Sequence, residues 1–271
     1  MKKFILKAEW DKMANYWNKD AGDTGVWHNY TDIDPVILEL IGNVKNKKIL
    51  EIGCGNGYLS RLLAQKGAEV IGTDLSQKLL DYAKEKEEIN PVGIKYFQRD
   101  AANLKGLKNN FFDIVIANMC LMDIKDADKA VEEANRVLKK NGRFVFSINH
   151  PVFFRQAWVY ARRNGKKFFA RAILKYKTPC ALKQTLWSTG IKVMGYRRPI
   201  EEYLKYLKNT GFVLNDFREI VSKKKLKKAR KGQLQEDKFR SSRYLDKADR
   251  KLKKAAKTEI PDFLLIAAIK K

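Results

Sequence analysis

The chain has 271 residues, of which 45% are hydrophobic and 32% charged, so it can bury a large core. This balance excludes a disordered chain, a collagen-like chain and a small domain built on disulfides. The cysteines Cys54, Cys120 and Cys180 form no CxxC pair, so no metal site and no disulfide framework is predicted. No apolar run approaches the roughly 20 residues of a spanning helix, and the opening MKKFILKAEW is too short for a signal peptide. We therefore expect a soluble, cytoplasmic, globular protein.

The charge is distributed unevenly along the chain. The 56 Lys and Arg residues outnumber the 31 Asp and Glu residues, which gives a formal net charge of +25. Residues 151–200 hold 12 basic and no acidic residues, and residues 223–257 hold 16 basic and 4 acidic residues. Residues 1–150 hold 23 basic and 21 acidic residues, a net charge of only +2. A general lysine bias would raise the charge everywhere, so the excess marks two local features of the molecule.

Strand-like and helix-like segments alternate over residues 47–150. The expected strands are 47–52, 68–74, 94–100, 111–119 and 143–149. The expected helices are 58–67, 76–88 with Ser76 as N-cap, and 126–140, which ends at Asn141-Gly142. This rhythm predicts a parallel sheet with helices on both faces. It stops over residues 151–198 and returns with a helix at 199–211 and strands at 212–220 and 262–270.

A glycine-rich loop, GCGNG at 53–57, joins the first strand to the first helix. Such a loop lets the backbone approach a ligand closely, but dinucleotide-binding proteins share it, so it is a weak signal alone. Tyr58 stands where the dinucleotide pattern GxGxxG needs glycine. Glu51, two residues before the loop, suits a ligand with an amino group and a sulfonium better than a pyrophosphate. Asp74 ends the second strand, where an acid can bind ribose hydroxyls, and Asp100 ends the third, where it can meet an exocyclic amine of adenine.

Five segments together resemble the motifs of class I S-adenosylmethionine-dependent methyltransferases. They are EIGCGNG at 51–57, GTDLS at 72–76, RDAANL at 99–104, FDIVIANMCLMDI at 112–124 and LKKNGRFVFSINHP at 138–151. The flanks GDTGVWHNYTDIDPVILELIG and YRRPIEEYLKYLKNTGFVL are similar to those of one bacterial and archaeal small-molecule subgroup. The resemblance implies an α/β fold: a doubly wound, mostly parallel Rossmann-like sheet of about seven strands, the last one antiparallel, with helices on both faces. It also implies an enzyme that uses S-adenosylmethionine as cofactor.

The resemblance further implies a single methyltransferase domain over residues 1–271. We divide it into an N-terminal cap (1–46), a cofactor-binding core (47–150), a basic aromatic lid (151–198) and a C-terminal helix and strand hairpin (199–271). The hairpin carries a basic insertion at 221–258.

By the same resemblance, ten residues surround the cofactor. Gly53, Gly55 and Gly57 line its methionine and ribose portion, with Glu51 nearby, and Asp74 binds the ribose. Leu75 packs on adenine, and Asp100 and Ala101 bind the adenine amino edge. Asn118 and Met119 face the sulfonium. Two alternatives stay open: Asp100 as a helix cap, and Leu75 as part of the core.

The catalytic residues are less determined, because methyl transfer from a sulfonium depends mainly on orientation and needs no dedicated base. His150 after the fifth strand, His28 in the cap and Asp123 after the fourth strand are candidate general bases. The alternatives are structural hydrogen bonds for the histidines and a helix cap for Asp123. Asn118-Met119-Cys120-Leu121 departs from the NPPY-type motif, which disfavours methylation of base amines, and Cys120 is favoured as a buried apolar residue over a nucleophile.

Both basic segments are expected to leave the sheet at the carboxyl ends of its strands, where ligands bind. Residues 151–198 mix aromatic and basic side chains, which suits RNA or an anionic membrane surface. Residues 223–257 are typical of a solvated helix, a flexible arm or an inert charged insertion. We expect a small-molecule acceptor, because the matching flanks belong to such a subgroup. The alternatives are an RNA or anionic-lipid methyltransferase that uses both segments, and a catalytically inactive nucleic-acid-binding module.

Overall fold

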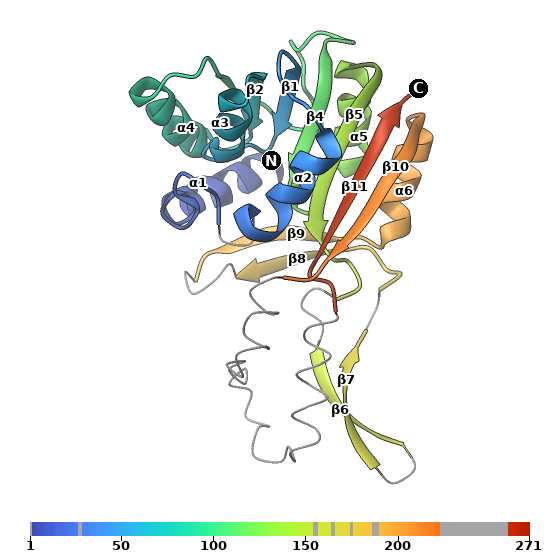
Figure 1. The fold of residues 1–271 in the computed structure, drawn as a ribbon. Helices are drawn as coiled ribbons and strands as arrows, with labels where there is room; N and C mark the ends of the chain where they lie inside the picture. The colour runs from blue at the N-terminus through green and yellow to red at the C-terminus, as the bar shows by residue number, and fades with distance from the viewer. Residues whose placement is uncertain are drawn as a thin grey trace.

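A seven-stranded sheet in the order β10-β11-β5-β4-β1-β2-β3 forms the centre of the computed structural model (Figure 1). The structure describes residues 2–26, 29–153, 157–163, 166–173, 176–185, 190–222 and 260–271. The strands of the sheet are β1 (Lys48–Ile52), β2 (Glu69–Asp74), β3 (Lys95–Gln98), β4 (Phe112–Asn118), β5 (Leu138–Asn149), β10 (Phe212–Ile220) and β11 (Phe263–Lys270). Neighbouring strands are parallel except for β11, which is antiparallel to both β5 and β10. The predicted mostly parallel sheet with an antiparallel last strand is confirmed.

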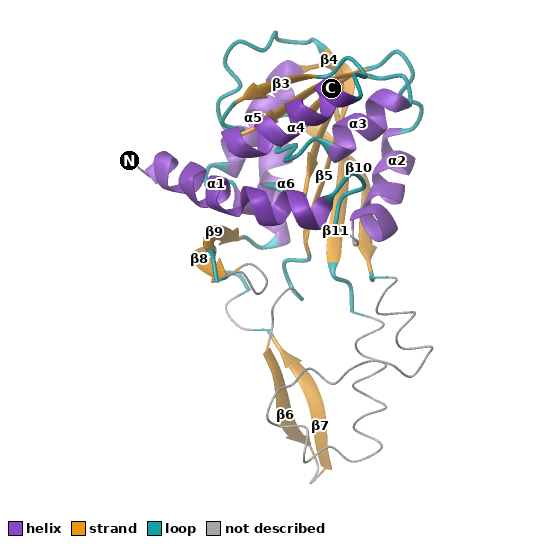
Figure 2. Ribbon diagram, turned by 90° about the vertical axis from the view of Figure 1, so that its left-hand side faces the viewer, coloured by secondary structure: helices purple, strands orange, loops and turns teal. Residues whose placement is uncertain are grey.

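Helices cover both faces of this sheet, as predicted. One face packs against α2 (Asp34–Ile41), α3 (Tyr58–Gln65) and α4 (Gln77–Ile89), and the other against α5 (Ala127–Val137) and α6 (Ile200–Asn209). Figure 2 shows α2 and α3 on one side of the strands and α6 on the other. Alternate residues of the central strands supply the two cores, because successive side chains of a strand point to opposite faces. Ile49 belongs to the first core and Leu50 to the second, and both are fully buried.

The boundaries of these elements follow local sequence signals closely, with one exception. Ser76 caps α4 as predicted, since its Oγ accepts a hydrogen bond of 3.2 Å from the backbone N of Leu79. The prediction of helix up to residue 140 is wrong: α5 ends at Val137 and β5 begins at Leu138. Leu138 is buried and pairs with Phe112 of β4, so packing against the sheet overrides helical continuation there.

Residues 151–198 contain two hairpins that hydrophobic periodicity did not predict. The first joins β6 (Ala157–Arg163) to β7 (Lys166–Ala172), and the second joins β8 (Cys180–Thr185) to β9 (Lys192–Arg197). Figure 1 shows β6 and β7 projecting away from the sheet, below the end of β5. Because β5 and β10 are both antiparallel to β11, both run toward this edge, as expected for the segments that follow them. Residues 223–257 lie outside the described residues.

The N-terminal helix α1 (Lys2–Ala21) lies across the carboxyl ends of the strands, near α4 and β9 (Figure 1). Asp11 Oδ1 accepts a hydrogen bond of 2.6 Å from Ser76 Oγ at the start of α4. In the last turn of α1, Asn18 Oδ1 accepts a hydrogen bond of 2.9 Å from Asn56 Nδ2 of the glycine loop. The π-helix η1 (Asn29–Ile33) then leads into α2. Within the described ranges, no helix combines the length and apolarity needed to span a bilayer.

Candidate functional site

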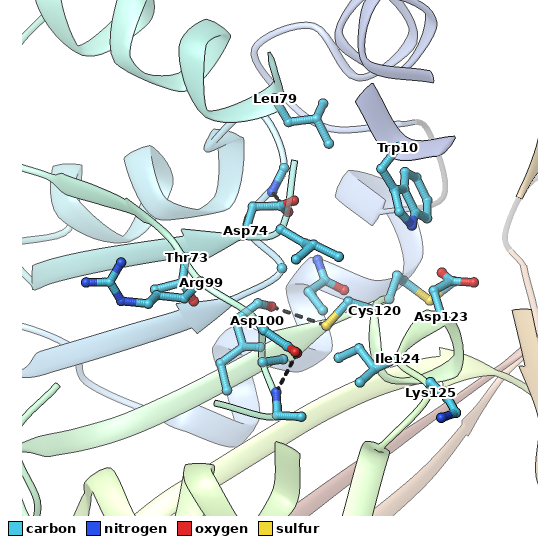
Figure 3. A pocket seen from close by; sticks show the side chains of 18 of the residues that line it. Trp10, Thr73, Asp74, Leu79, Arg99, Asp100, Cys120, Asp123, Ile124 and Lys125 are labelled. Carbon is cyan, nitrogen blue, oxygen red and sulfur yellow. Dashed lines mark hydrogen bonds between the residues drawn. The ribbon is translucent and has the colours of Figure 1, made fainter. Parts of the chain in front are cut away.

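A cavity of about 180 Å³ lies at the carboxyl ends of β1, β2 and β4 (Figure 3). Its walls come from the glycine loop, the ends of β2 to β4, the 3-10 helix η2 (Leu121–Asp123) and α1. Eight of the ten predicted cofactor residues line it: Gly53, Gly55, Asp74, Leu75, Asp100, Ala101, Asn118 and Met119. The cavity therefore lies where the motifs of the sequence converge, at the edge of a parallel sheet at which ligands bind.

The glycine loop is confined between neighbouring side chains. Gly53, Gly55 and Gly57 have φ angles of 68°, 57° and 74°, in the left-handed region that favours glycine. A Cβ at Gly53 would lie 2.7 Å from Cβ of Cys120, and one at Gly57 would lie 2.3 Å from the hydroxyl oxygen of Tyr96. Space and backbone angle therefore both require glycine at 53 and 57, and Gly53 and Gly55 line the cavity.

Asp74 fixes the loop to the end of β2. Its carboxylate accepts hydrogen bonds from the backbone N of Gly55 at 2.9 Å and of Ser76 at 2.8 Å. Burial raises the pKa of Asp74 from its ordinary value, and the two backbone donors oppose that shift. The carboxylate therefore already organises the backbone that a ligand meets (Figure 3).

Glu51 lies beneath the loop rather than in the cavity wall. Its side chain is 2% exposed, and Ser60 Oγ of α3 donates to Glu51 Oε2 at 2.5 Å. Burial raises the pKa of Glu51 to about 8, so the carboxyl group is protonated at neutral pH. Gly57, the other predicted residue outside the wall, is the N-cap of α3.

The far wall of the cavity is a turn after β3. Asp100 Oδ1 accepts a hydrogen bond of 2.9 Å from the backbone N of Ala102 (Figure 3), so Asp100 stabilises a turn rather than a helix start. The carbonyl oxygen of Leu75 opposite accepts from Gln98 Nε2 at 3.0 Å. The carboxylate of Asp100 and the apolar side chain of Leu75 thus face one space from neighbouring strands.

Asn118, Met119 and Cys120 form the wall at the end of β4. Met119 has a φ of 54°, and its backbone N donates to Ser147 Oγ at 2.8 Å. Cys120 Sγ donates to the carbonyl oxygen of Ile52 at 3.2 Å (Figure 3). Burial raises the pKa of Cys120 well above its ordinary value, so the side chain is a neutral thiol and not a thiolate nucleophile.

The three candidate bases have different surroundings. Asp123 lines the cavity on η2 (Figure 3). His150 is 1% exposed and is not part of the wall: its Nε2 lies 2.8 Å from Glu219 Oε1, and its ring stacks on Phe153 with 4.8 Å between centroids. Burial lowers the pKa of His150, against the effect of Glu219. His28 lies outside the described residues. The described residues contain no cluster of His, Cys, Asp and Glu suited to a metal ion.

Two further parts of the wall were not predicted as ligand contacts. Trp10 and Trp17 of α1 line the cavity and meet edge to face, with 6.1 Å between ring centroids. Together with the buried residues Met13, Ala14 and Ala21, they recur every three or four residues. This helical periodicity in the sequence predicts that all five lie on one face of α1. Figure 3 shows Trp10 opposite the ends of the strands.

Arg198, which follows β9, holds η2 in place. It is 7% exposed and donates to the carbonyl oxygens of Leu121 at 3.3 Å, Ile124 at 2.7 Å and Lys125 at 2.6 Å. Ile124 and Lys125 line the cavity. No local sequence pattern reveals this contact, because Arg198 is 73 residues from Lys125 in the chain.

Comparison with known proteins agrees with the geometry. Residues 50–146 match a family model described as a methyltransferase domain. The chain is 32% identical over 196 residues to a ubiquinone biosynthesis O-methyltransferase of Coxiella burnetii, an alignment that covers 69% of this chain and 81% of the relative.

Solved structures share the fold. An S-adenosylmethionine-dependent methyltransferase from Mesorhizobium loti has a TM-score of 0.66 at 23% identity, with 89% of this chain and 97% of that chain covered. Phosphoethanolamine N-methyltransferase 2 of Haemonchus contortus, solved with S-adenosyl-L-methionine, has a TM-score of 0.60 at 19% identity, with 96% and 57% covered. With the glycine loop, Asp74 and the cavity in place, the chain belongs to the class I S-adenosylmethionine-dependent methyltransferases, and S-adenosylmethionine is its cofactor.

Proposed function

We propose that this enzyme methylates a hydroxyl group of a small organic acceptor. The observation that carries the proposal is the 32% identity over 196 residues to an O-methyltransferase named for ubiquinone biosynthesis. The apolar side chains of Trp10, Trp17 and Ile124 on the cavity wall support an acceptor with an apolar or aromatic body. Under this proposal the two basic segments do not form the reaction centre.

The residues of this chain act by binding and orientation. The cofactor supplies a methyl group already activated on a sulfonium. We place Gly53 and Gly55 next to its methionine portion, with Glu51 nearby, beneath the loop. Asp74 then meets the ribose hydroxyls, and Asp100 the adenine edge. Since the displacement requires an in-line approach, holding the acceptor oxygen opposite the carbon–sulfur bond is the main contribution of the protein.

Asp123 is the base that we propose for the acceptor proton. As the acceptor oxygen attacks the methyl carbon, the carbon–sulfur bond breaks with its electron pair on sulfur, and the hydroxyl proton passes to the carboxylate. Among the described candidates Asp123 lies on the cavity wall, whereas His150 is paired with Glu219. An Asp123→Asn variant is expected to lower kcat about 100-fold while leaving cofactor affinity nearly unchanged.

Radiolabel transfer tests the acceptor class. Methyl-tritiated S-adenosylmethionine is incubated with the enzyme and a demethylated extract, which is then separated into RNA, lipid and small-molecule fractions. We expect counts in the small-molecule fraction, in a form that alkali does not release, because an ether survives alkali and an ester does not. Counts confined to RNA would overturn the proposal.

A second candidate function is methylation of an anionic macromolecule such as RNA. It is favoured by the charge in residues 151–200 and 223–257, the segments that follow β5 and β10 in the sequence. This function predicts binding that weakens by about 0.7 log units per tenfold salt for each phosphate contact on single-stranded RNA. Replacing residues 223–257 by a short neutral linker separates the two functions: small-molecule turnover should persist, and RNA turnover should be lost.

We also propose the division of the chain that the sequence suggested. Residues 1–46 act as a cap over the cavity, 47–150 as the cofactor-binding core, and 151–198 as a lid beside the acceptor entrance. Met194 of β9 supports a link between cap and lid, because its backbone N donates to Glu9 Oε2 of α1 at 3.0 Å.

A further inference from the structure

A chain of buried hydrogen bonds runs behind the cavity wall, from the backbone of Met119 to the carboxylate of Asp34. The backbone N of Met119 donates to Ser147 Oγ at 2.8 Å, and Ser147 Oγ donates to Asn118 Oδ1 at 2.6 Å. Asn118 Nδ2 then donates to the Tyr58 hydroxyl at 2.8 Å, and that hydroxyl donates to Asp34 Oδ1 at 3.1 Å. Asp34, Tyr58, Asn118 and Ser147 are all buried.

The direction of this chain is fixed at both ends. A backbone N–H can only donate and an ionised carboxylate can only accept, and the bonds between them run in one direction, from Met119 N to Asp34 Oδ1. Asn29 Nδ2 donates to the Tyr58 hydroxyl at 2.7 Å, which leaves Tyr58 free to donate only toward Asp34. Asn118 Nδ2 also lies 3.4 Å from Asp34 Oδ1. The two acceptors of the Asn118 amide nitrogen, the Tyr58 hydroxyl and Asp34 Oδ1, therefore both lie inside the protein.

The consequence concerns what Asn118 offers to a ligand. Asn118 lines the cavity; its amide nitrogen donates to groups inside the protein, and Oδ1, which accepts from Ser147 Oγ, keeps a second lone pair for a ligand. An oxygen carries partial negative charge and favours a positively charged neighbour. In S-adenosylmethionine the positive charge is on the sulfonium.

We propose that Tyr58 and Asp34 are positioning residues for methyl transfer, because they hold the Asn118 amide with its oxygen toward the sulfonium. The proposal rests on the placement of the cofactor under the proposed function, but not on the identity of the acceptor. Tyr58 is well suited to the role because Gly25 packs closely against its ring: a Cβ at Gly25 would lie only 2.6 Å from ring atoms of Tyr58. This role also gives a reason for a tyrosine at position 58, where a dinucleotide-binding loop has glycine.

The test compares two ligands that differ in charge at the sulfur. S-Adenosylmethionine carries the sulfonium charge and S-adenosylhomocysteine does not, so the ratio of their dissociation constants reports the local potential at the sulfur. Calorimetric titration of Tyr58→Phe should show S-adenosylhomocysteine affinity within about threefold of the parent. The preference for S-adenosylmethionine should fall by about fivefold, the typical effect of one hydrogen bond.

Two variants accompany this measurement. Tyr96→Phe removes another buried hydroxyl, one without a hydrogen bond in the described part of the chain, and should leave the ratio unchanged. Asn118→Ala removes the oxygen itself and should lower the ratio at least as far as Tyr58→Phe. The double variant Tyr58→Phe with Asn118→Ala should show no further loss, since both act through one atom.

The outcomes separate clearly. If the ratio of dissociation constants is unchanged in Tyr58→Phe but lowered in Asn118→Ala, the positioning role is refuted. A parental ratio in both variants shows that the oxygen does not face the sulfonium, and the proposal fails. Should Tyr58→Phe lose its cooperative unfolding transition, Asp34→Leu decides, because it removes the acceptor at the end of the hydrogen-bond chain; an unchanged ratio in that variant overturns the proposal. None of these measurements uses an acceptor, so an error in the acceptor class leaves them intact.

Discussion

The cofactor-binding core and residues 151–198 differ in how their structures arise from their sequences. In the core, β1, β4 and β5 lie between two layers of helices, and their apolar residues are buried on both faces. In residues 151–198, the described strands pair only within two-stranded hairpins. Yet Val193 and Arg198, near the end of this second region, are buried, and Arg198 bonds to Ile124 and Lys125 of the cavity wall. The hydrophobic pattern of the sequence predicts which core residues are buried. In residues 151–198 the burial of Arg198 depends instead on its contacts with a loop that is distant in the sequence.

The largest expected effect tests the core side of this comparison. Gly53→Ala places a Cβ 2.7 Å from Cβ and 2.9 Å from Sγ of Cys120, at a φ of 68°. The loop must then move, and we expect S-adenosylhomocysteine affinity to fall about 100-fold, a loss that overpacking and backbone strain together can produce. Calorimetric titration measures it.

Gly93→Ala is the matched control. Gly93 also has a positive φ, of 87°, but nothing lies within 4 Å of its Cβ position. It should cost about 1 kcal/mol of stability through backbone strain and leave the affinity unchanged. Equal affinity losses in the two variants would contradict the steric argument, because strain alone would then explain both.

Asp74→Asn should weaken cofactor binding by about 30-fold. An amide in place of the carboxylate retains one acceptor oxygen, so one of the backbone N–H groups of Gly55 and Ser76 faces an NH₂ group. The ligand also loses a charged partner for its hydroxyl groups. Fluorescence titration of Trp10 and Trp17 reports binding, with Asp81→Asn on the exposed side of α4 as control. Unaltered binding in Asp74→Asn would show that this carboxylate serves the loop alone.

Arg198→Met tests the other side of the comparison. It removes three hydrogen bonds to carbonyl oxygens around η2, and we expect the free energy of unfolding to fall by about 3 kcal/mol. Cofactor affinity should fall about tenfold, because Ile124 and Lys125 line the cavity. Urea denaturation and calorimetric titration measure the two effects, with exposed Lys192→Met as control. A change in stability without a change in affinity would separate residues 151–198 from the cofactor site.

These contrasts explain what the sequence could predict. The glycine loop, Asp74 and Asp100 stand next to strands with strong local patterns, so their convergence at one sheet edge follows from topology. Arg198 and η2 meet only in the folded chain, and no periodicity connects them. The chain of hydrogen bonds from Met119 to Asp34 joins four separate elements, and no motif indicates that its members bond to one another. Asn118 could be predicted as a wall residue, but the orientation of its amide could not.

The sequence and the structure place Glu51 differently, and among the cavity-side variants we expect the smallest change of cofactor affinity at this residue. The motif placed it near the methionine portion of the cofactor, whereas the structure buries it against Ser60. Its folded pKa of about 8 lies above the ordinary value of 4.5, so the folded state retains a proton that the unfolded state has lost. Stability from this group is therefore full below about pH 4.5 and declines as the pH rises toward 8.

Glu51→Gln removes this titration and keeps a group that can accept from Ser60. We expect urea denaturation at pH 5 and pH 8 to show a smaller loss of stability in the variant than in the parent, by on the order of 2 kcal/mol. The slope should not vanish, because Asp34, with a pKa of about 6, titrates in the same direction. If Glu51 acts only from beneath the loop, cofactor affinity at pH 7 should change less than threefold. A large loss of affinity together with an unchanged pH slope would instead place an ionised Glu51 against the cofactor, since a charge that binds the ligand amino group would not titrate near pH 8.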